Sequence, residues 1–534
     1  AFEAALHEVW ESVMGVGLLP QPTLNSDGTE IFDVSGLGAS PEQTAPYSVL
    51  GLENFGRDDV SIKHIPGWIP STHSNPDVDG SMSLPKEAIL SGFREGYITL
   101  ESHKEELLSP KGPLMPFSSC VRRVIVRDTK RYGGLQVDEC HPDLLRDQLD
   151  RQWHWDNLWT DILSRPILSL FVQSELAQVG RGDIPHFSGL IGETCVRGTD
   201  GSIIELASYQ PEPPISVVRS RITSLSEENL RKQEWFLRAS LGYQEKRTLS
   251  QGVIRSDESY LSNAIRIGDA VVASLTYWED GAWFNTAECI FGENQKDKSG
   301  FRISPAGWAM YDGAVGVALF LAYLGDQSGQ RKFTDTAMKL IREVERRLEG
   351  SGITDTGGFT GLASVVYAFT HLAALTGEAH LLESSEKLLP KILASIESDG
   401  GLDVLSGAAG QLLAVMPLLH IDRTGICEKI VKAVSARLSS LPEFDSELHD
   451  LPYARGLSHG LSGVALALFK AGKVLKDERM REHAVQIMLR EQRLTQEGQW
   501  TDSHEINGRC QISWCHGAPG IAIALFGFVG ELDD

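Results

Sequence analysis

The chain has 534 residues, too many for one ordinary hydrophobic core, so two domains are expected. Its 42% hydrophobic and 23% charged residues are typical of a soluble globular protein, and its net charge of -23 argues against binding nucleic acid or an anionic membrane. Its apolar runs are shorter than the ~18–20 residues of a membrane-spanning helix, and its first residues lack the pattern of a secretory signal. Seven scattered cysteines, an odd number, make no disulfide framework, so we expect a reduced, cytoplasmic protein.

The first half, residues 1 to about 255, begins with stretches rich in proline and glycine. The composition of residues 17–38 predicts a long ordered loop or a linker. Helices are expected over residues 86–108 and 142–159.

A basic segment, VRRVIVRDTKRYGGL at residues 121–135, is unusual in this acidic chain. Within ten residues it places five cations: Arg122, Arg123, Arg127, Lys130 and Arg131. Clustered arginines suit a phosphate group, because the guanidinium fork can bond two phosphate oxygens at once. A solvated basic face is the alternative, and charge alone favours it.

The second half contains a repeat in which a Gly-rich turn leads into an apolar helix. The five copies are YDGAVGVALFLAYL, GGFTGLASVVYAFTHLAAL, LSGAAGQLLAVMPLL, LSHGLSGVALALFKAG and WCHGAPGIAIALFGF. We take the glycines that close these turns to be Gly316, Gly361, Gly410, Gly463 and Gly520, which are 45, 49, 53 and 57 residues apart. A period of this length indicates a repeated supersecondary unit.

Amphipathic helices are expected between the Gly turns. In residues 331–350, six apolar side chains fall on one helical face: Phe333, Ala337, Leu340, Ile341, Val344 and Leu348. Each repeat is therefore a hairpin of one amphipathic helix and one nearly all-apolar helix, which must be buried. The pattern predicts a mainly α fold, an α/α toroid with the apolar helices inside and the Gly turns gathered at one end. An open α-solenoid is the alternative, since periodicity alone does not close a ring.

Three of the turns carry chemically reactive residues: Asp403, His459, and the pair Cys515 and His516. Taken singly, a cysteine is often a small buried apolar residue and a histidine is often a hydrogen-bonded core residue. Their recurrence at corresponding corners of one repeat favours a shared site instead. A thiolate, an imidazole and a carboxylate suit either a zinc ion or a base that activates a thiol.

The turns GLSHGLSG, SWCHGAPGI, YDGAVGVALFLAYL and DVLSGAAG resemble the signature turns of the lanthionine cyclase family. The resemblance implies an α/α toroid whose zinc, held by two Cys and one His, binds a substrate thiolate that adds to a dehydroamino acid. By this resemblance Cys515 is a zinc ligand, His459 is the acid/base and Asp403 is the acidic residue facing the site. His516 is not a ligand by the same comparison.

The first half also resembles a known family. ESVMGVGLLP, FDVSGLG, ILSGFREGY, VRRVIVRDTKRY and SELAQVGRGDIPHF run in the order found in class II lanthipeptide synthetases. In those proteins a dehydratase similar to a lipid kinase uses ATP and magnesium to phosphorylate Ser and Thr, and then eliminates phosphate. Arg123 and Thr129 match the R-x5-T pattern that serves elimination, and Arg127 within it is expected to help hold phosphate. Glu175 and Asp183 also match, with an expected structural role.

The resemblance implies that residues 1–255 are the later part of the dehydratase domain and residues 256–534 an incomplete lanthionine cyclase-like toroid. The family's ATP-binding lobe would precede residue 1, and its two other zinc ligands would follow residue 534, so we expect a piece of a longer protein. The expected partners are a ribosomally made precursor peptide with a leader and an export transporter, with no nucleic acid.

Two other functions are weighed against this one. A six-hairpin α/α glycosidase would need two carboxylates ~5–10 Å apart at the ring mouth, whereas these turns offer mainly Cys and His. A zinc-free helical scaffold that binds peptides would carry the same repeat without catalysis. Zinc content and alkylation of Cys515 separate the scaffold from the enzyme.

Overall fold

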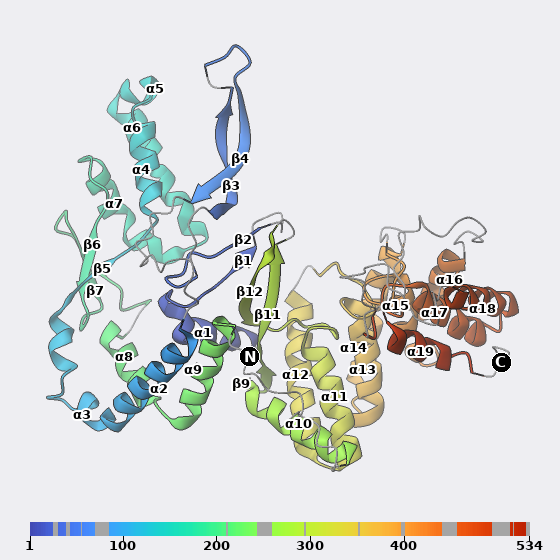
Figure 1. Ribbon diagram of the computed structural model, residues 1–534. Helices are drawn as coiled ribbons and strands as arrows, with labels where there is room; N and C mark the ends of the chain where they lie inside the picture. Colours follow the sequence, from blue (N-terminus) through green and yellow to red (C-terminus); the bar gives the residue numbers. More distant parts are fainter. Residues whose placement is uncertain are drawn as a thin grey trace. The chain divides into compact units, whose positions relative to one another are not determined.

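The computed structural model describes residues 1–24, 30–38, 43–54, 56–69, 85–209, 212–242, 259–292, 295–350, 353–396, 401–439, 456–493, 513–515 and 517–529. The chain forms two compact units (Figure 1). The first joins residues 1–75 to 239–534, and the second is residues 76–238. Most elements are helices, as the sequence predicts. In the described ranges no helix is both long and apolar enough to cross a membrane.

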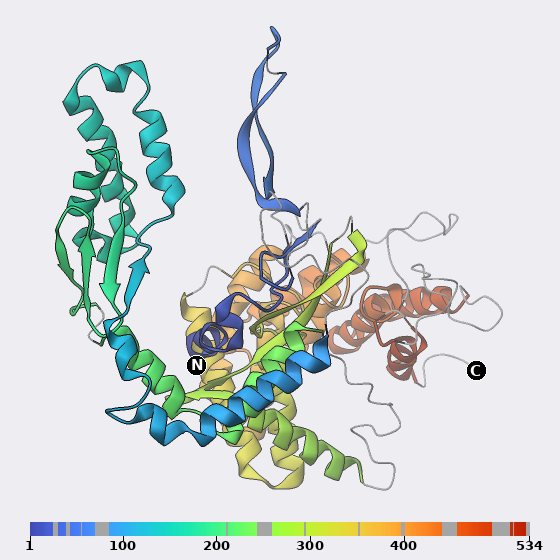
Figure 2. The same ribbon diagram turned by 60° about the vertical axis from the view of Figure 1, so that its left-hand side comes forward.

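The second unit is built on a four-stranded antiparallel sheet in the order β5-β6-β7-β8 (Figure 2). Its strands are β5 (Val121–Val124), β6 (Phe187–Leu190), β7 (Cys195–Gly198) and β8 (Ile203–Glu205). The first strand is the start of the basic segment, and it sets Arg123 opposite Ser188 of β6. Apolar side chains of the sheet, among them Phe187 and Val196, are buried against Phe171.

The helices of the second unit are shorter than the sequence predicts. The expected helix over residues 142–159 is interrupted because the Asp147 side chain accepts a hydrogen bond from the amide of Leu149 and so starts a new helix. The helical segments are α2 (Lys86–Ser102), α3 (Lys104–Leu108), η2 (Met115–Ser119), α4 (Thr129–Asp138), α5 (Pro142–Leu145), α6 (Gln148–Trp155), η3 (Asp156–Leu163), η4 (Pro166–Leu170), α7 (Val172–Val179), α8 (Pro214–Thr223) and α9 (Glu227–Ser240).

The first unit begins with α1 (Phe2–Glu11) and η1 (Val13–Val16), and its strands pair in antiparallel twos. The expected loop over residues 17–38 contains one such pair, β1 (Thr23–Leu24) with β2 (Ile31–Phe32). The remaining strands are β3 (Gln43–Glu53), β4 (Ser61–Ile69), β9 (Thr276–Trp278), β10 (Gly281–Trp283), β11 (Asn285–Gly292) and β12 (Gln295–Pro305).

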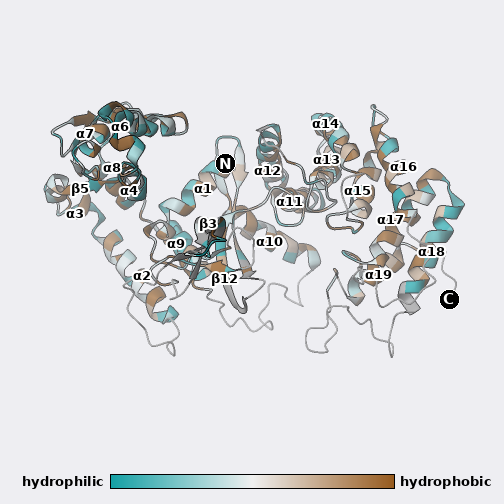
Figure 3. Ribbon diagram, turned by 90° about the horizontal axis from the view of Figure 1, so that it is seen from above, coloured by the Kyte–Doolittle hydropathy of each residue, from teal (hydrophilic) through white to brown (hydrophobic). Residues whose placement is uncertain are grey.

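Helical hairpins make up the rest of the first unit. Figure 3 shows α11, α13, α15, α17 and α19 following one another along the inside of a curve, with α12, α14, α16 and α18 outside them. This is the inner-and-outer arrangement of an α/α toroid. The bounds are α10 (Tyr260–Ser274), α11 (Ala314–Ser328), α12 (Arg331–Gly350), α13 (Leu362–Thr376), α14 (His380–Ser395), α15 (Ala408–Val415), η6 (Met416–Leu418), α16 (Ile426–Ser439), α17 (Leu461–Leu475), α18 (Glu478–Arg493) and α19 (Ala518–Phe526).

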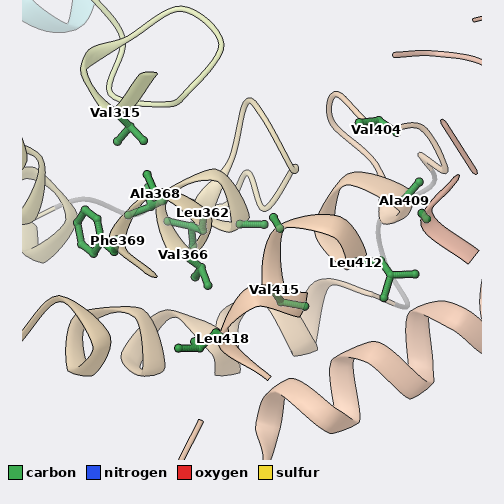
Figure 4. Packing of buried hydrophobic residues seen from close by; sticks show 14 of the residues in the cluster. Val315, Leu362, Val366, Ala368, Phe369, Val404, Ala409, Leu412, Val415 and Leu418 are labelled. Carbon is green, nitrogen blue, oxygen red and sulfur yellow. The ribbon is translucent and has the colours of Figure 1, made fainter. Parts of the chain in front are cut away.

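The packing of these hairpins follows the predicted apolar pattern. Five of the six residues predicted to form the apolar face of α12 are fully buried, and the sixth, Leu348, is half-buried. The inner helices α13, α15 and α17 bury side chains on several faces, because each of them packs on an outer helix and two inner neighbours. Figure 4 shows α13 and α15 side chains in this core, among them Val366, Phe369 and Leu412.

The structure corrects the register of the repeat. The glycines directly before the five inner helices are Gly313, Gly361, Gly407, Gly460 and Gly517, which are 48, 46, 53 and 57 residues apart by position. Gly361 is therefore the first glycine of its turn, and Ser364 is the residue that corresponds to Gly316 or Gly410. The error arose because this turn has a serine where the other four have their closing glycine.

Candidate active site on the Gly turns

Backbone hydrogen bonds join the five Gly turns into one row. The amides of Met310 and Tyr311 donate to the carbonyl of Phe359, each at 3.1 Å. The Phe359 amide in turn donates to Leu405 at 2.8 Å. The third turn is joined to the fourth in the same way, because the amide of Val404 donates to the carbonyl of Ser458 at 2.9 Å. The expectation that the Gly turns gather at one end is confirmed for these residues.

The last link of the row reaches the candidate zinc ligand. The amide of Ser458 donates to the carbonyl of Cys515 at 3.1 Å. Because His459 follows Ser458 and Asp403 precedes Val404, the three predicted site residues stand on three consecutive turns.

Small residues let the turns close this tightly. A Cβ atom on Gly410 would lie 1.9 Å from the carbonyl oxygen of Val404 and 3.0 Å from the Cα of Gly358, on the neighbouring turn. Corresponding glycines meet the carbonyl six residues earlier in the same way: Gly316, Gly463 and Gly520. A side chain at these positions would clash with the carbonyl of its own turn and so force that turn open.

Asp403 and His459 form a hydrogen-bonded pair between the third and fourth turns. Nδ1 of His459 lies 2.7 Å from Oδ2 of Asp403, and both side chains are partly buried. The other carboxylate oxygen, Oδ1, accepts from the amides of Ser406 and Gly407, at 2.9 and 2.7 Å. The carboxylate is thus fixed to the start of α15 and holds the proton of His459 on Nδ1.

Cys515 is a partly buried free thiol in the fifth turn. Its Sγ lies 3.2 Å from the hydroxyl of Ser513. Within the described residues no three His, Cys, Asp or Glu side chains gather as a metal site would require. The thiolate of Cys515 is a typical zinc ligand, but the described residues do not supply the other ligands that a zinc site needs. His516 lies outside the described residues.

An aromatic contact shows that the row of turns is curved. The ring of Phe359, on the second turn, lies 5.7 Å between centroids from the ring of Trp514, on the fifth. Two turns that are not successive in the row therefore approach each other on the side of the candidate site.

In the second unit, the basic segment divides into exposed and buried residues. Arg123 lies on β5 and Thr129 begins α4, and both are exposed. Among the described residues, neither side chain makes a hydrogen bond or an ion pair. Both are therefore accessible to a ligand.

Arg127, between them in sequence, is buried in a polar network. Its guanidinium makes a bidentate pair with the fully buried Glu175, with Nε to Oε1 at 2.8 Å and Nη2 to Oε2 at 3.1 Å. Nη1 bonds Asp161 and Nη2 also bonds the carbonyl of Leu158. Burial opposes the charge, yet the bonds to Glu175 raise the pKa of Arg127. Every guanidinium nitrogen already donates to a protein oxygen.

Tyr132 completes this network from α4. Its hydroxyl donates to Oε1 of Glu175 at 2.5 Å. Burial and this hydrogen bond raise the pKa of Tyr132. Arg127, Glu175 and Tyr132 thereby tie α4 to α7 and fix the segment that carries Arg123 and Thr129. Asp183, the other residue expected to be structural, is exposed and pairs with Arg181 at 3.5 Å.

Comparisons with known proteins cover both halves of the chain. Residues 304–534 match the family described as lanthionine synthetase C-like protein, and residues 1–189 match a domain of unknown function, DUF4135. A curated relative, the lacticin 481/lactococcin biosynthesis protein LcnDR2 of Lactococcus lactis subsp. lactis, is 22% identical over 542 residues. Together these similarities, one in each half of the chain, support a class II lanthipeptide synthetase. The similarity covers 97% of the chain and 55% of the relative, so the chain spans about half the length of the curated relative it matches.

These similarities confirm the resemblance seen in both halves and favour it over the glycosidase. The first match contains all five Gly turns, and the second contains the basic segment.

Sequence reasoning missed three residues that build the candidate sites: Ser458, Ser513 and Tyr132. Ser513 stands two residues before Cys515, so its position alone is a usable signal. Ser458 acts through its backbone and Tyr132 through a buried hydrogen bond, and neither leaves a pattern in the sequence.

Proposed function

We propose that the chain acts in lanthipeptide biosynthesis, on a precursor peptide in which Ser and Thr are dehydrated and Cys thiols then form thioether rings. The observation that carries the proposal is the row of backbone hydrogen bonds that sets Asp403, His459 and Cys515 on consecutive turns. The family match over residues 304–534 supports the same chemistry.

In the proposed ring-forming step, His459 moves the proton. Nε2 takes the proton of a substrate Cys thiol, and the thiolate adds to Cβ of a dehydroamino acid. The electron pair of the double bond moves to the α-carbon side as an enolate, which then takes a proton at Cα from the imidazolium. Asp403 stabilises that imidazolium and holds the ring in orientation.

Cys515 is proposed as one zinc ligand, and Ser513 as the hydroxyl that orients its thiolate. Zinc would supply a lowered thiol pKa at this site. ATP and magnesium for the phosphorylation step, a cytoplasmic location and association with an export transporter are parts of the same proposal that rest on the family.

In the proposed elimination step, Arg123 binds the phosphate of a phosphoserine or phosphothreonine, and Thr129 donates a hydrogen bond to it. A water molecule takes the Cα proton, the electron pair of the C–H bond forms the Cα–Cβ double bond, and the Cβ–O bond breaks so that phosphate leaves. A guanidinium suits the departing phosphate because it gives two parallel charged hydrogen bonds. We assign Arg127 a positioning role in this step, because its donors are engaged by Glu175, Asp161 and Leu158.

The test incubates the chain with a precursor peptide that already carries phosphoserine and phosphothreonine, followed by mass spectrometry and thiol alkylation. The proposal predicts loss of phosphoric acid from these residues together with loss of alkylatable Cys thiols. His459→Asn is expected to leave dehydrated peptide with free thiols. An unmodified peptide, or rings formed equally by the variant, would contradict the proposal.

A further inference from the structure

A groove opens on the outer face of the hairpins. It lies between the outer helices α12 and α14, and Phe369 of the inner helix α13 forms part of its floor. Its volume is about 450 Å³, within the range of sites that hold a ligand. The next pair of outer helices, α14 and α16, pack directly on each other. The groove is therefore a local feature of the first pair.

The two walls present matching helical faces to the groove. On α12 the lining residues are Arg342, Glu345, Arg346 and Glu349, and on α14 they are Ser384, Lys387, Leu388 and Lys391. Both sets follow the i, i+3, i+4, i+7 spacing of one helical face. Over eight residues each face is roughly 10 Å long, or two helical turns. Between them the floor is apolar, with Leu348 and Leu388 beside Phe369.

The charges on the walls are not balanced. Arg342 donates to the carbonyl of Asp280 at 3.1 Å, and Arg346 pairs with Asp280 and Glu343. Glu345 is engaged as well, since Ser384 donates to it at 2.8 Å. Lys387 and Lys391, one turn apart and exposed, make no hydrogen bond or ion pair among the described residues. On the opposite wall the exposed carboxylate of Glu349 also has no partner among the described residues. Two free cations on α14 and one free carboxylate on α12 thus stand above the apolar floor, in a chain of net charge -23.

We propose that this groove binds an acidic amphipathic helix of about two turns, supplied by the precursor peptide outside the residues that are modified. Apolar side chains of such a helix fit the floor, and its carboxylates face Lys387 and Lys391. The choice of the precursor rests on the proposed function. A peptide modified at several residues in turn gains from a second anchor, because tethering raises the effective concentration of each residue at the active site.

Binding is tested with two fluorescein-labelled amphipathic peptides of about 12 residues that share Leu at i, i+3, i+4 and i+7 but carry Glu or Lys beside it. Fluorescence anisotropy with the full chain is expected to give the Glu peptide at least tenfold tighter binding. The double variant K387E/K391E is expected to weaken it about tenfold. Lys429→Glu, at an exposed lysine on α16, is the matched control and should leave binding unchanged. Equal binding of both peptides, or unchanged affinity of the double variant for the Glu peptide, would overturn the proposal that the groove binds an acidic helix.

The source of the helix is tested with the precursor itself. K387E/K391E is expected to raise KM for precursor modification about tenfold and to leave kcat unchanged, because the groove does not touch the reacting atoms. A normal KM in the variant would overturn the proposal that the precursor binds in the groove, while the proposed function would stand. If the Glu peptide binds but the chain modifies no peptide, the proposed function fails and the assignment to the precursor fails with it.

Discussion

Asp403 and His459 are 56 residues apart in sequence and lie on neighbouring Gly turns, where Oδ2 of Asp403 is 2.7 Å from Nδ1 of His459. The same carboxylate accepts two backbone amides at the start of α15, so it cannot turn away from the imidazole without releasing that helix end. The geometry of the pair is therefore a property of the turn and does not depend on a bound substrate.

The substitution Asp403→Asn separates the effect of the carboxylate charge on activity from the effect of its hydrogen bonds on stability. The amide keeps an oxygen for the turn but loses the charge that stabilises an imidazolium, so thioether formation is expected to fall about 10²–10⁴-fold with little change in melting temperature. Asp403→Ala should lower activity similarly and also cost about 1–3 kcal/mol of stability through the lost hydrogen bonds to the amides of Ser406 and Gly407. Thiol alkylation and thermal unfolding measure the two effects. Equal stability of both variants would show that the carboxylate does not hold the turn.

Cys515→Ala tests the proposed zinc ligand by metal content. Zinc per chain, measured by elemental mass spectrometry after dialysis, is expected to fall well below that of the unmodified chain. Cys427 is a matched control, because burial raises the pKa of its thiol to about 12 and disfavours the thiolate that binds metal. Cys427→Ala should keep the zinc. Unchanged zinc in Cys515→Ala would remove this residue from the site.

The closing glycines give a prediction about packing. Gly410→Ala places a Cβ against Val404 and Gly358, so it is expected to destabilise the chain by about 1–3 kcal/mol and to slow ring formation. Gly92→Ala, in an open position inside α2, makes the same change without a clash and should stabilise its helix slightly. Chemical denaturation of the two variants is the measurement, and a stable, active Gly410→Ala chain would contradict the close approach.

The buried network of the second unit predicts an alkaline limit to stability. Because the folded pKa of Tyr132 lies above its unfolded value of about 10, folding favours the protonated hydroxyl. Its stabilising contribution is complete below about pH 10 and declines as the pH rises through the folded pKa. Urea unfolding between pH 8 and 11 should show this decline, and Tyr132→Phe should make it shallower. An identical slope in the variant would exclude Tyr132 as its source.

The same network predicts that Arg127 and Arg123 contribute differently to stability. Arg127→Ala leaves the carboxylate of Glu175 buried without its partner, so a loss of about 3–5 kcal/mol in stability is expected. Arg123→Ala removes an exposed side chain that has no partner in the described residues and should leave stability nearly unchanged. Urea denaturation followed by circular dichroism compares the two. Similar stability in both variants would contradict the positioning role of Arg127.

The hairpins could be predicted from the sequence because their apolar faces repeat at helical spacing and their turns repeat glycine. The one register error, at Gly361, came from the serine that stands where the other four turns have their closing glycine. The hydroxyl of this residue, Ser364, donates to the carbonyl of Gly361 at 2.7 Å. The candidate site was predicted from residue types at turn corners. That Asp403 and His459 touch depends on backbone bonds from Val404 to Ser458, which have no side-chain signature.

The buried state of Arg127 could not be predicted for a different reason. In sequence it is one of five similar cations, and only the fold brings Glu175 and Asp161, 48 and 34 residues away, against its guanidinium. The short strands, β5 among them, were missed because four residues are too few for an alternating pattern to be distinguished from a basic loop.

The most direct test of the account supplies the chain with a precursor peptide that already carries phosphoserine and follows the peptide by mass spectrometry. The chain is expected to remove phosphoric acid and leave dehydroalanine, while Arg123→Ala and Thr129→Ala leave the phosphopeptide intact. A chain that leaves phosphoserine unchanged, or an Arg123→Ala variant that eliminates phosphate at the normal rate, would contradict the account.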